Sequence, residues 1–359
     1  MNAIEYNVLG LMSGTSMDGL DIAHCTIQKM NATYSYCLND VSTIEYPDNI
    51  QIKLKRSTEL SANELAIFDH ELGKWMGNQV NGFINCYSPI VDFIASHGHT
   101  VFHQPYNRMT LQIGNGVDIH QATQLPVIFD FRSLDVANGG QGAPLVPVGD
   151  KLLFGEYDAC LNLGGFANIS FQKATERIAY DICPLNIIFN FLANENGMSF
   201  DNKGALARSG AVNNEMLAKL DLLAYYKLDY PKSLGYEWFA ENMIPLISNT
   251  ELSLVDRLAT SVEHVARQIS SSIKFDKILV TGGGAFNNYL LERIEKCRRS
   301  KYQLIVPDKT LVNYKEALVF AFLGVLKVEQ EVNTLKSVTG AFTDSCGGSI
   351  VGQIPLKKH

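Results

Sequence analysis

The spacing of apolar and polar residues along the chain predicts alternating strands and helices. Near the N-terminus, an apolar run that starts at Val8 breaks into the small polar residues 13–19 and resumes at Leu20, Ile22 and Ala23. This pattern is typical of a β-hairpin. The same criterion predicts further strands at 34–37, 41–46, 90–95, 126–129, 159–163, 169–172, 178–181, 278–280 and within 337–350.

Helical spacing of apolar residues is clearest between Ser61 and Ser88, where Leu65, Phe68 and Leu72 begin a stripe that Pro89 ends. Residues 110–114 are expected to form a turn, and residues 201–210 a loop. Because helices and strands alternate along the whole chain, the sequence predicts an α/β fold. The other helices are predicted at 116–124, 187–194, 212–223, 252–273 and 315–328.

Two domains are expected from the length of 359 residues and from a repeated architecture. Residues 159–172 again read as strand, small polar turn and strand, like residues 8–27. The glycine-dense stretch 138–144 is suited to a hinge or domain crossing. We therefore expect one domain from 1–135 plus 338–359 and a second from 136–337.

Composition narrows the class of protein. The net charge of −7 argues against a nucleic-acid partner or an anionic membrane surface, which normally demand a basic face. The first residues lack the pattern of a signal peptide, and no later apolar run reaches membrane-spanning length, so we expect a cytoplasmic protein. The seven cysteines are scattered without CxxC pairs, which suggests neither a disulfide framework nor a zinc knuckle.

The turn of the first hairpin has the composition of a phosphate site. Gly14 and Gly19 leave room for a ligand near the backbone, and the hydroxyls between them add donors. Asp18 and Asp21 then suit Mg²⁺, held directly or through its waters. The alternative is a tight hairpin whose polar residues only cap the turn.

Three further polar clusters follow predicted strands. His97, His99 and His103 could together bind a metal, but no carboxylate or cysteine completes a ligand set, and polar contacts are preferred. Arg132 follows the strand 126–129. Asp181 ends the strand 178–181 and is the candidate general base, the alternative being a structural or helix-capping aspartate.

Glycine-rich turns also follow strands in the second half. Residues 281–287 place three glycines between a strand and a helix, which allows close approach by the base and ribose of a nucleotide. The alternative is a tight turn without a ligand. Together with a phosphate turn and a carboxylate, these turns provide what phosphoryl transfer needs.

The motifs also resemble one known family. Residues 10–21, Gly-Leu-Met-Ser-Gly-Thr-Ser-Met-Asp-Gly-Leu-Asp, resemble the N-terminal motif of the anhydro-N-acetylmuramic acid kinases. Motifs of that family follow in the same order at 96–105, 110–114, 130–132, 139–146, 162–170, 231–233, 282–287 and 316–317. The resemblance implies two actin-like (ribonuclease H-like) domains, with mixed sheets flanked by helices and an ATP cleft between the domains.

The activity implied by this resemblance is an ATP- and Mg²⁺-dependent step of peptidoglycan recycling by a homodimer. The family opens the 1,6-anhydro bridge of anhydro-N-acetylmuramic acid with water and phosphorylates O6. By resemblance, Asp181 activates the water, His97, Arg132 and Glu316 contact the sugar, and Asp18 and Asp21 hold Mg²⁺. The residues expected to bind ATP are Gly14, Thr15, Ser16, Met17, Asp18, Gly19, Leu20, Asp21, Gly164, Gly165, Gly282, Gly283, Gly284 and Asn287.

The chain departs from the family pattern beside the expected base. Where the family usually reads Phe-Asp-Thr-Gly-Pro-Gly-Asn, residues 180–186 read Tyr-Asp-Ile-Cys-Pro-Leu-Asn, and His99 stands where glutamine is common. Two alternatives therefore stay open beside the leading function. One is a kinase for another sugar, such as levoglucosan or a hexose, and the other is a non-catalytic nucleotide-binding regulator.

Overall fold

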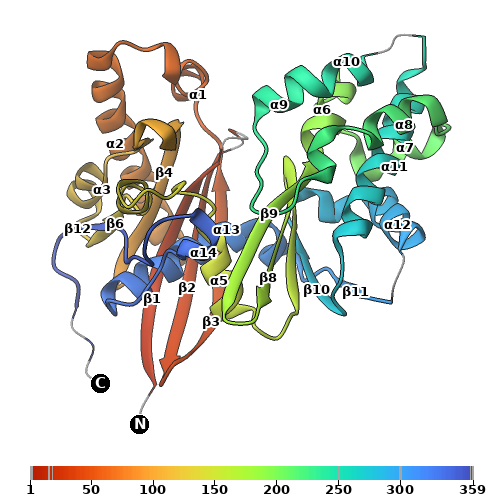
Figure 1. Cartoon of the computed structure of the whole chain (residues 1–359). Coiled ribbons are helices and arrows are strands. Elements are labelled where there is room, and N and C mark those ends of the chain that lie inside the picture. The colour runs from red at the N-terminus through yellow and green to blue at the C-terminus, as the bar shows by residue number, and fades with distance from the viewer. Residues whose placement is uncertain are drawn as a thin grey trace. The chain divides into compact units, whose positions relative to one another are not determined.

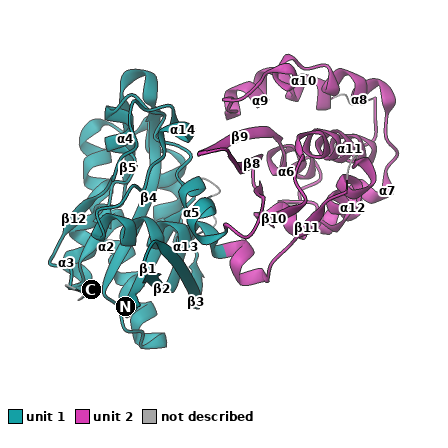
Figure 2. Ribbon diagram, turned by 60° about the horizontal axis from the view of Figure 1, so that its bottom comes forward, with its two compact units in different colours: residues 1–154, 314–359 teal, residues 155–313 magenta. Residues whose placement is uncertain are grey.

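The computed structural model describes residues 3–14, 17, 19–248, 251–298, 301–355 and 357 (Figure 1). Contacts divide the chain into unit 1, residues 1–154 with 314–359, and unit 2, residues 155–313 (Figure 2). Residues 136–154 and 314–337 thus group with unit 1. Because these units are defined by contacts alone, the functional boundaries expected at 135/136 and 337/338 stay a prediction.

Unit 1 contains one mixed sheet of seven strands. Its path runs β12-β6-β4-β1-β2-β3, with β5 paired to β4. The strands are β1 (Ile4–Ser13), β2 (Leu20–Met30), β3 (Thr33–Ile44), β4 (Phe93–Gln104), β5 (Met109–Ile113), β6 (Val127–Phe129) and β12 (Ser349–Val351). The helices are α1 (Asp48–Lys55), α2 (Ala62–Tyr87), α3 (Gly116–Thr123), α4 (Ser133–Ala137), α5 (Val146–Leu153) and α14 (Lys336–Thr339).

Helices cover both faces of this sheet. On one face, Phe68 and Leu72 of α2 join Leu9 and Ile94 of the sheet in one hydrophobic core. The predicted helix 61–88 is confirmed, and Ser61 begins it with a capping box to Glu64. Helix α13 (Lys309–Val328), which starts within unit 2 and continues into unit 1, packs on the opposite face.

Unit 2 contains a five-stranded mixed sheet with the order β11-β10-β7-β8-β9. Its strands are β7 (Ala159–Leu163), β8 (Phe166–Lys173), β9 (Glu176–Pro184), β10 (Lys277–Thr281) and β11 (Gln303–Ile305). Its helices are α6 (Asn186–Asn194), α7 (Ala205–Ser209), α8 (Asn214–Asp221), α9 (Tyr236–Asn242), α10 (Ile244–Ile247), α11 (Leu254–Ser272) and α12 (Asn288–Cys297), with 3₁₀ turns η4 (Ala224–Lys227) and η5 (Gly283–Phe286). One core joins the sheet to the helices, with Leu161 and Ile169 packed among Phe189, Leu258 and Leu290.

Both sheets share one topology. In each, three consecutive strands form an antiparallel meander (β1-β2-β3 and β7-β8-β9), and two later strands add in parallel beside the first strand of the meander (β4 and β6; β10 and β11). The expected α/β class, with duplicated domains and mixed sheets flanked by helices, is confirmed.

Several expected element bounds were wrong. The strand expected at 90–95 runs from Phe93 to Gln104, and residues 110–114 belong to β5 instead of a turn. The loop expected at 201–210 contains α7, while α5, α9, α10 and β11 had not been predicted. None of the helices within the described residues is both long and apolar enough to cross a membrane.

Candidate functional site

The first hairpin of unit 1 is confirmed as β1 and β2, paired antiparallel from Ile4↔Lys29 to Ser13↔Leu20. In its turn, the Met17 N–H donates to the carbonyl of Gly14 at 3.2 Å. The predicted ligands Thr15, Ser16 and Asp18 lie outside the described residues. Gly14 directly follows Ser13, whose pairing with Leu20 is the last of the two strands.

A buried chain of hydrogen bonds supports this turn. The Tyr46 hydroxyl donates to Ser13 Oγ at 2.6 Å, and Ser13 Oγ lies 2.9 Å from His99 Nδ1. Burial lowers the pKa of His99 to about 4, so its imidazole is neutral at pH 7. Ser13, the last residue of β1, is therefore fixed by Tyr46, which follows β3, and by His99 of β4.

Asp21 carries the carboxylate of this turn that the structure describes. It lies at the second position of β2, where Thr43 is its cross-strand partner and donates a hydroxyl hydrogen bond of 2.6 Å to Oδ1. Thr43 Oγ1 also lies 2.9 Å from the hydroxyl of Tyr314. Asp21 is thus an oriented oxygen donor of the type that Mg²⁺ uses.

A second cluster of unit 1 joins His97 and Arg132. Arg132 donates from Nε at 3.0 Å and from Nη2 at 2.8 Å to His97 Nε2, which must therefore be unprotonated. The remaining proton lies on Nδ1, which donates to the Gly98 carbonyl at 2.9 Å. Burial and the Arg132 charge hold the pKa of His97 well below its usual range, so this tautomer persists at neutral pH.

Arg132 is held from its other side by the glycine-rich stretch. Its Nη1 donates to the carbonyl of Gly142 at 2.6 Å. The buried Asp135 accepts from the Gly142 N–H at 2.7 Å and from the Thr339 hydroxyl at 2.7 Å. Neither Asp135 nor Thr339 was predicted as a site residue, yet both fix the loop that orients the guanidinium.

Glu316 approaches this cluster on α13. The helix begins six residues earlier than expected, so Glu316 lies in its interior and not near its start. Helix α13 can lie against β1 because Gly10 has no side chain: a Cβ there would be 2.0 Å from the Ala317 carbonyl oxygen. The side chain of Glu316 keeps solvent-accessible surface, but the protein around its carboxyl group raises the pKa of that group, and the charges of Arg132 and Lys315 oppose the shift.

The three histidines of β4 do not present a ligand set. Both nitrogens of His97 are engaged as described, and His103 Nδ1 lies 3.3 Å from the Thr110 hydroxyl. No group of three or more histidine, cysteine, aspartate or glutamate side chains arranged for a metal ion is found in the part of the chain that the structure describes. The strand continues through these residues, so they do not follow its end as expected.

In unit 2, Asp181 lies inside β9, which continues to Pro184, and not at the end of a strand as expected. Its Oδ2 accepts the Leu234 N–H at 2.9 Å, and its own N–H donates to the Lys232 carbonyl at 3.2 Å. The Tyr225 hydroxyl donates to the Asp181 carbonyl oxygen at 2.6 Å. Burial raises the pKa of Asp181 to about 6, and the Leu234 N–H opposes this shift.

Two glycine turns of unit 2 meet at the carboxyl ends of the parallel neighbours β7 and β10. Gly282 has φ +83°, and a Cβ there would lie 2.4 Å from Asn162 Oδ1. The Gly164 and Gly165 carbonyls accept N–H groups at the start of α6. The expected residues brought together here are Gly164, Gly165, Gly282, Gly283 and Gly284.

Asn287, also expected to bind ATP, has a structural contact. Its Oδ1 accepts the Leu290 N–H at 3.0 Å and so caps the start of α12. A polar row that sequence reasoning had missed crosses the same sheet, where Asn162 pairs with Asn168 and Asn168 pairs with Asp181. The signal was present, because Asn162 and Asn168 each lie three residues from Gly165, on which the pairing of the hairpin is centred.

The residues that depart from the family pattern pack into the core of unit 2. Ile182, Cys183 and Leu185 are buried there, and β9 has a bulge at Ile182, since Asp181 pairs with Asn168 and Cys183 with Ala167. Their side chains therefore replace small residues with apolar packing.

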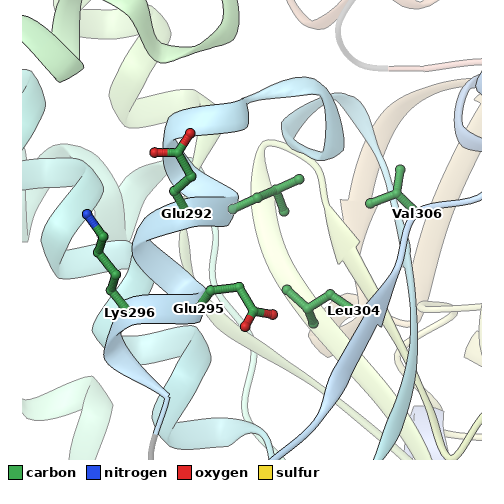
Figure 3. A pocket seen from close by; sticks show the side chains of 6 residues that line it. Glu292, Glu295, Lys296, Leu304 and Val306 are labelled. Carbon is green, nitrogen blue, oxygen red and sulfur yellow. The ribbon is translucent and has the colours of Figure 1, made fainter.

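A shallow cavity of about 460 Å³ lies elsewhere in unit 2, over α12 and β11 (Figure 3). Glu292 and Glu295 of the helix and Leu304 and Val306 near the strand line it. None of the expected site residues is among its lining residues.

Comparison with known proteins gives consistent matches over the chain. A family model described as anhydro-N-acetylmuramic acid kinase matches residues 6–353. The protein of that name from Francisella tularensis subsp. novicida is 33% identical, covering 95% of this chain and 97% of the relative. The one from Aliivibrio fischeri is 35% identical, covering 93% and 95%. Among solved structures, one match is the activator of 2-hydroxyisocaproyl-CoA dehydratase from Clostridium difficile with bound ADPNP. The match covers 91% of this chain and 98% of that chain, at 14% identity and a TM-score of 0.41.

Proposed function

Because the chain belongs to the anhydro-N-acetylmuramic acid kinase family, we propose that it converts 1,6-anhydro-N-acetylmuramic acid, ATP and water into N-acetylmuramic acid 6-phosphate and ADP. The reaction joins two steps. The water oxygen bonds to the anomeric carbon as the bond from that carbon to O6 breaks, and O6 then takes the γ-phosphoryl group of ATP. We further propose that the protein acts as a homodimer in the cytoplasm.

The observation that carries this proposal is the environment of Asp181. Burial raises its pKa to about 6, which lies close enough to neutral for a carboxylate that must be ionised and still accept a proton. The Leu234 N–H fixes its carboxylate. The Tyr225 hydroxyl, which donates to the Asp181 carbonyl, and the Lys232 carbonyl, which accepts the Asp181 N–H, fix its backbone. In the proposed reaction, Asp181 takes a proton from the attacking water, a step that typically contributes about 10²- to 10⁴-fold to the rate.

His97, Arg132 and Glu316 are proposed to contact the sugar. The neutral His97 and the Gly142 carbonyl hold the planar guanidinium of Arg132 in one orientation. Glu316 makes no hydrogen bond to any residue that the structure describes, so its carboxyl group, whose pKa partial desolvation raises, is available to sugar hydroxyls. A fixed cation beside an available carboxylate suits an acceptor with many hydroxyl groups and a carboxylate of its own.

ATP is proposed to use the glycine-rich turns of the two units. Residues 14–21 would bind its phosphates, and Gly164, Gly165, Gly282, Gly283, Gly284 and Asn287 its nucleoside end. Open space beside the backbone supports this at two positions: an added Cβ would meet no atom within 4 Å at Gly165 and none nearer than 3.7 Å at Gly283. Asp21, and Asp18 outside the described residues, would hold Mg²⁺, which neutralises phosphate charge when bound.

The test is release of ADP by purified protein with Mg·ATP, measured with and without the anhydrosugar, followed by mass analysis in H₂¹⁸O. We expect sugar-dependent ADP release and a product heavier than the sugar by one phosphoryl group and one water. The ¹⁸O label belongs on the anomeric carbon. Label in the phosphate, or ADP release that ignores the sugar, contradicts the proposal.

The matched variant is Asp181→Asn, which keeps the size of the side chain and an acceptor for the Leu234 N–H. We expect it to bind nucleotide like the wild type and to lose at least 10²-fold in kcat. Wild-type turnover by this variant would remove Asp181 from the reaction.

A further inference from the structure

Four polar side chains form one row across the sheet of unit 2. Thr281 of β10 pairs with Asn162 of β7, Asn162 pairs with Asn168 of β8, and Asn168 pairs with Asp181 of β9. Residues paired directly across neighbouring strands project from the same face of a sheet. The row therefore brings two carboxamides beside Asp181, and Asn168 is its immediate neighbour.

The carboxamide of Asn168 differs from those of other asparagines near this turn. Asn186 donates to the Leu163 carbonyl and Asn287 caps α12, so both of those asparagines have structural contacts. By contrast, neither Asn162 nor Asn168 makes a side-chain hydrogen bond to any residue within the described part of the chain. Asn168 is only partly exposed, and a half-buried amide without a protein partner is costly unless a ligand or water satisfies it.

The spacing suits one shared water molecule. Paired residues on adjacent antiparallel strands have Cβ atoms about 4.5–5.5 Å apart. A water that donates two hydrogen bonds of about 2.8 Å at its tetrahedral angle joins oxygens about 4.5 Å apart, a separation that side-chain oxygens on neighbouring paired residues can adopt. Asp181 and Asn168 can therefore hold the two hydrogens of a single water.

We propose that Asn168 is a further catalytic residue, whose carboxamide oxygen accepts one hydrogen of the attacking water while Asp181 accepts the other. This inference rests on the proposed function. The water oxygen forms its bond to the anomeric carbon, and the electron pair of the broken bridge goes to O6. One proton passes to Asp181. The other stays on the oxygen as the new hydroxyl, because an amide oxygen orients a hydrogen without removing it.

Two substitutions separate this role from simple packing. Asn168→Ala removes the acceptor, and we expect kcat to fall about 10²-fold while the KM values for sugar and ATP stay within about threefold. Asn168→Asp keeps the acceptor and the shape of the side chain, so it should recover most of the loss at high pH. Gln172→Ala, four residues along the same strand and exposed, is the matched control and should behave as wild type.

Asn168→Asp also gives a pH signature. A second carboxylate beside Asp181 opposes its ionisation, so the pH at which kcat/KM falls on the acidic side should rise by one unit or more. Cys183 on β9 and Tyr225 on η4 interact with Asp181, and burial raises the pKa of both, so they stay neutral in this range. The neighbouring cation is Lys232, whose carbonyl accepts the Asp181 N–H and whose ammonium group donates to the Tyr225 carbonyl, and burial lowers its pKa. A packing defect alone would not change the pH at which kcat/KM falls on the acidic side.

The outcomes decide between the two proposals. The role of Asn168 is overturned, and the proposed function is not, if Asp181→Asn is inactive and one of two further results is found. The first is that kcat/KM of Asn168→Asp falls at the same acidic pH as that of the wild type. The second is that Asn168→Ala keeps more than a third of the wild-type kcat. If the wild type releases no sugar-dependent ADP, the proposed function is overturned and the inference with it.

Discussion

At the scale of single residues, Asp181 combines a chemical advantage with a cost in stability. Burial disfavours its charged form, which gives a pKa of about 6 in the folded protein against about 3.9 for an ordinary aspartate. The folded state therefore holds the proton more tightly than the unfolded state. Stability is undiminished below about pH 4, falls as the pH rises to about 6, and the full cost is present above that.

Asp181→Asn should remove this cost. The shift of about two units corresponds to about 3 kcal/mol, and partial exposure of the group reduces it, so we expect a gain of about 1–3 kcal/mol in the free energy of unfolding at pH 7.5. The gain should shrink as the pH falls through 6 and vanish near pH 4. Denaturant titrations at pH 4, 6 and 7.5 measure this difference, and a gain that does not vary with pH would show that the charge is not its cause.

Arg132 is the residue for which a conservative change is most informative. Its planar guanidinium donates to His97 and to the Gly142 carbonyl at once. The single ammonium group of a lysine cannot reproduce this geometry. We expect Arg132→Lys to raise the KM for the sugar at least tenfold and to leave nucleotide affinity within about twofold. Arg56→Lys, an exposed position, is the control. Unchanged sugar kinetics would place the sugar away from Arg132.

At the scale of elements, the approach of α13 to β1 depends on the absence of one methyl group. A Cβ on Gly10 would meet the Ala317 carbonyl at 2.0 Å, and backbone cannot move aside as a side chain can. We expect Gly10→Ala to lower the free energy of unfolding by about 2–3 kcal/mol. Because α13 carries Glu316, the KM for the sugar should rise as well.

Gly82→Ala is the matched control for this change. Gly82 lies on the exposed side of α2, with no atom within 4 Å of an added Cβ. Alanine favours a helix over glycine by about 0.5–1 kcal/mol, so this variant should be slightly more stable than the wild type. Thermal unfolding of both variants checks the pair. Equal effects would mean that the close packing of α13 on β1 contributes nothing.

Local pattern was enough to predict the first hairpin, the long helix and most strands, but not where strands end. β4 continues from Phe93 to Gln104 because β5 pairs with its second half. The apolar residues at 90–95 alone do not reveal this pairing, because β5 lies later in the sequence. The same holds for Asp181, which β8 holds within β9. Strand length is decided by such pairing more than by intrinsic preference.

The candidate site was predicted residue by residue but not as an arrangement. Asp181, Arg132 and the glycine turns stand out in the sequence because charges and glycines follow apolar runs. Asp135, Thr339 and Asn168 do not, because their importance comes from register and from a contact between residues 204 positions apart. A one-residue shift in the register of β8 would move Asn168 to the opposite face from Asp181.

At the scale of the whole molecule, the shared strand order of the two units gives each one a hairpin with a glycine-containing turn at equivalent positions, β1-β2 and β7-β8. The sequences of these hairpins barely match, yet each turn follows the first strand of its meander. The repeated architecture therefore explains why the candidate ATP residues occur in two separate groups along the chain.

The net charge of the chain bears on how ATP enters. Its 37 acidic and 30 basic side chains give −7, so the protein as a whole repels a highly anionic nucleotide. We expect Mg²⁺ to arrive with ATP as a neutralising partner and not as part of the resting fold. Activity should disappear in excess EDTA and return with Mg²⁺, whereas the melting temperature without nucleotide should not change. With Mg·ATP at 100 times its Kd, the fold should gain about 2.7 kcal/mol, and EDTA should remove most of that gain. A fall in melting temperature on adding EDTA to the nucleotide-free protein would instead reveal a metal that belongs to the fold.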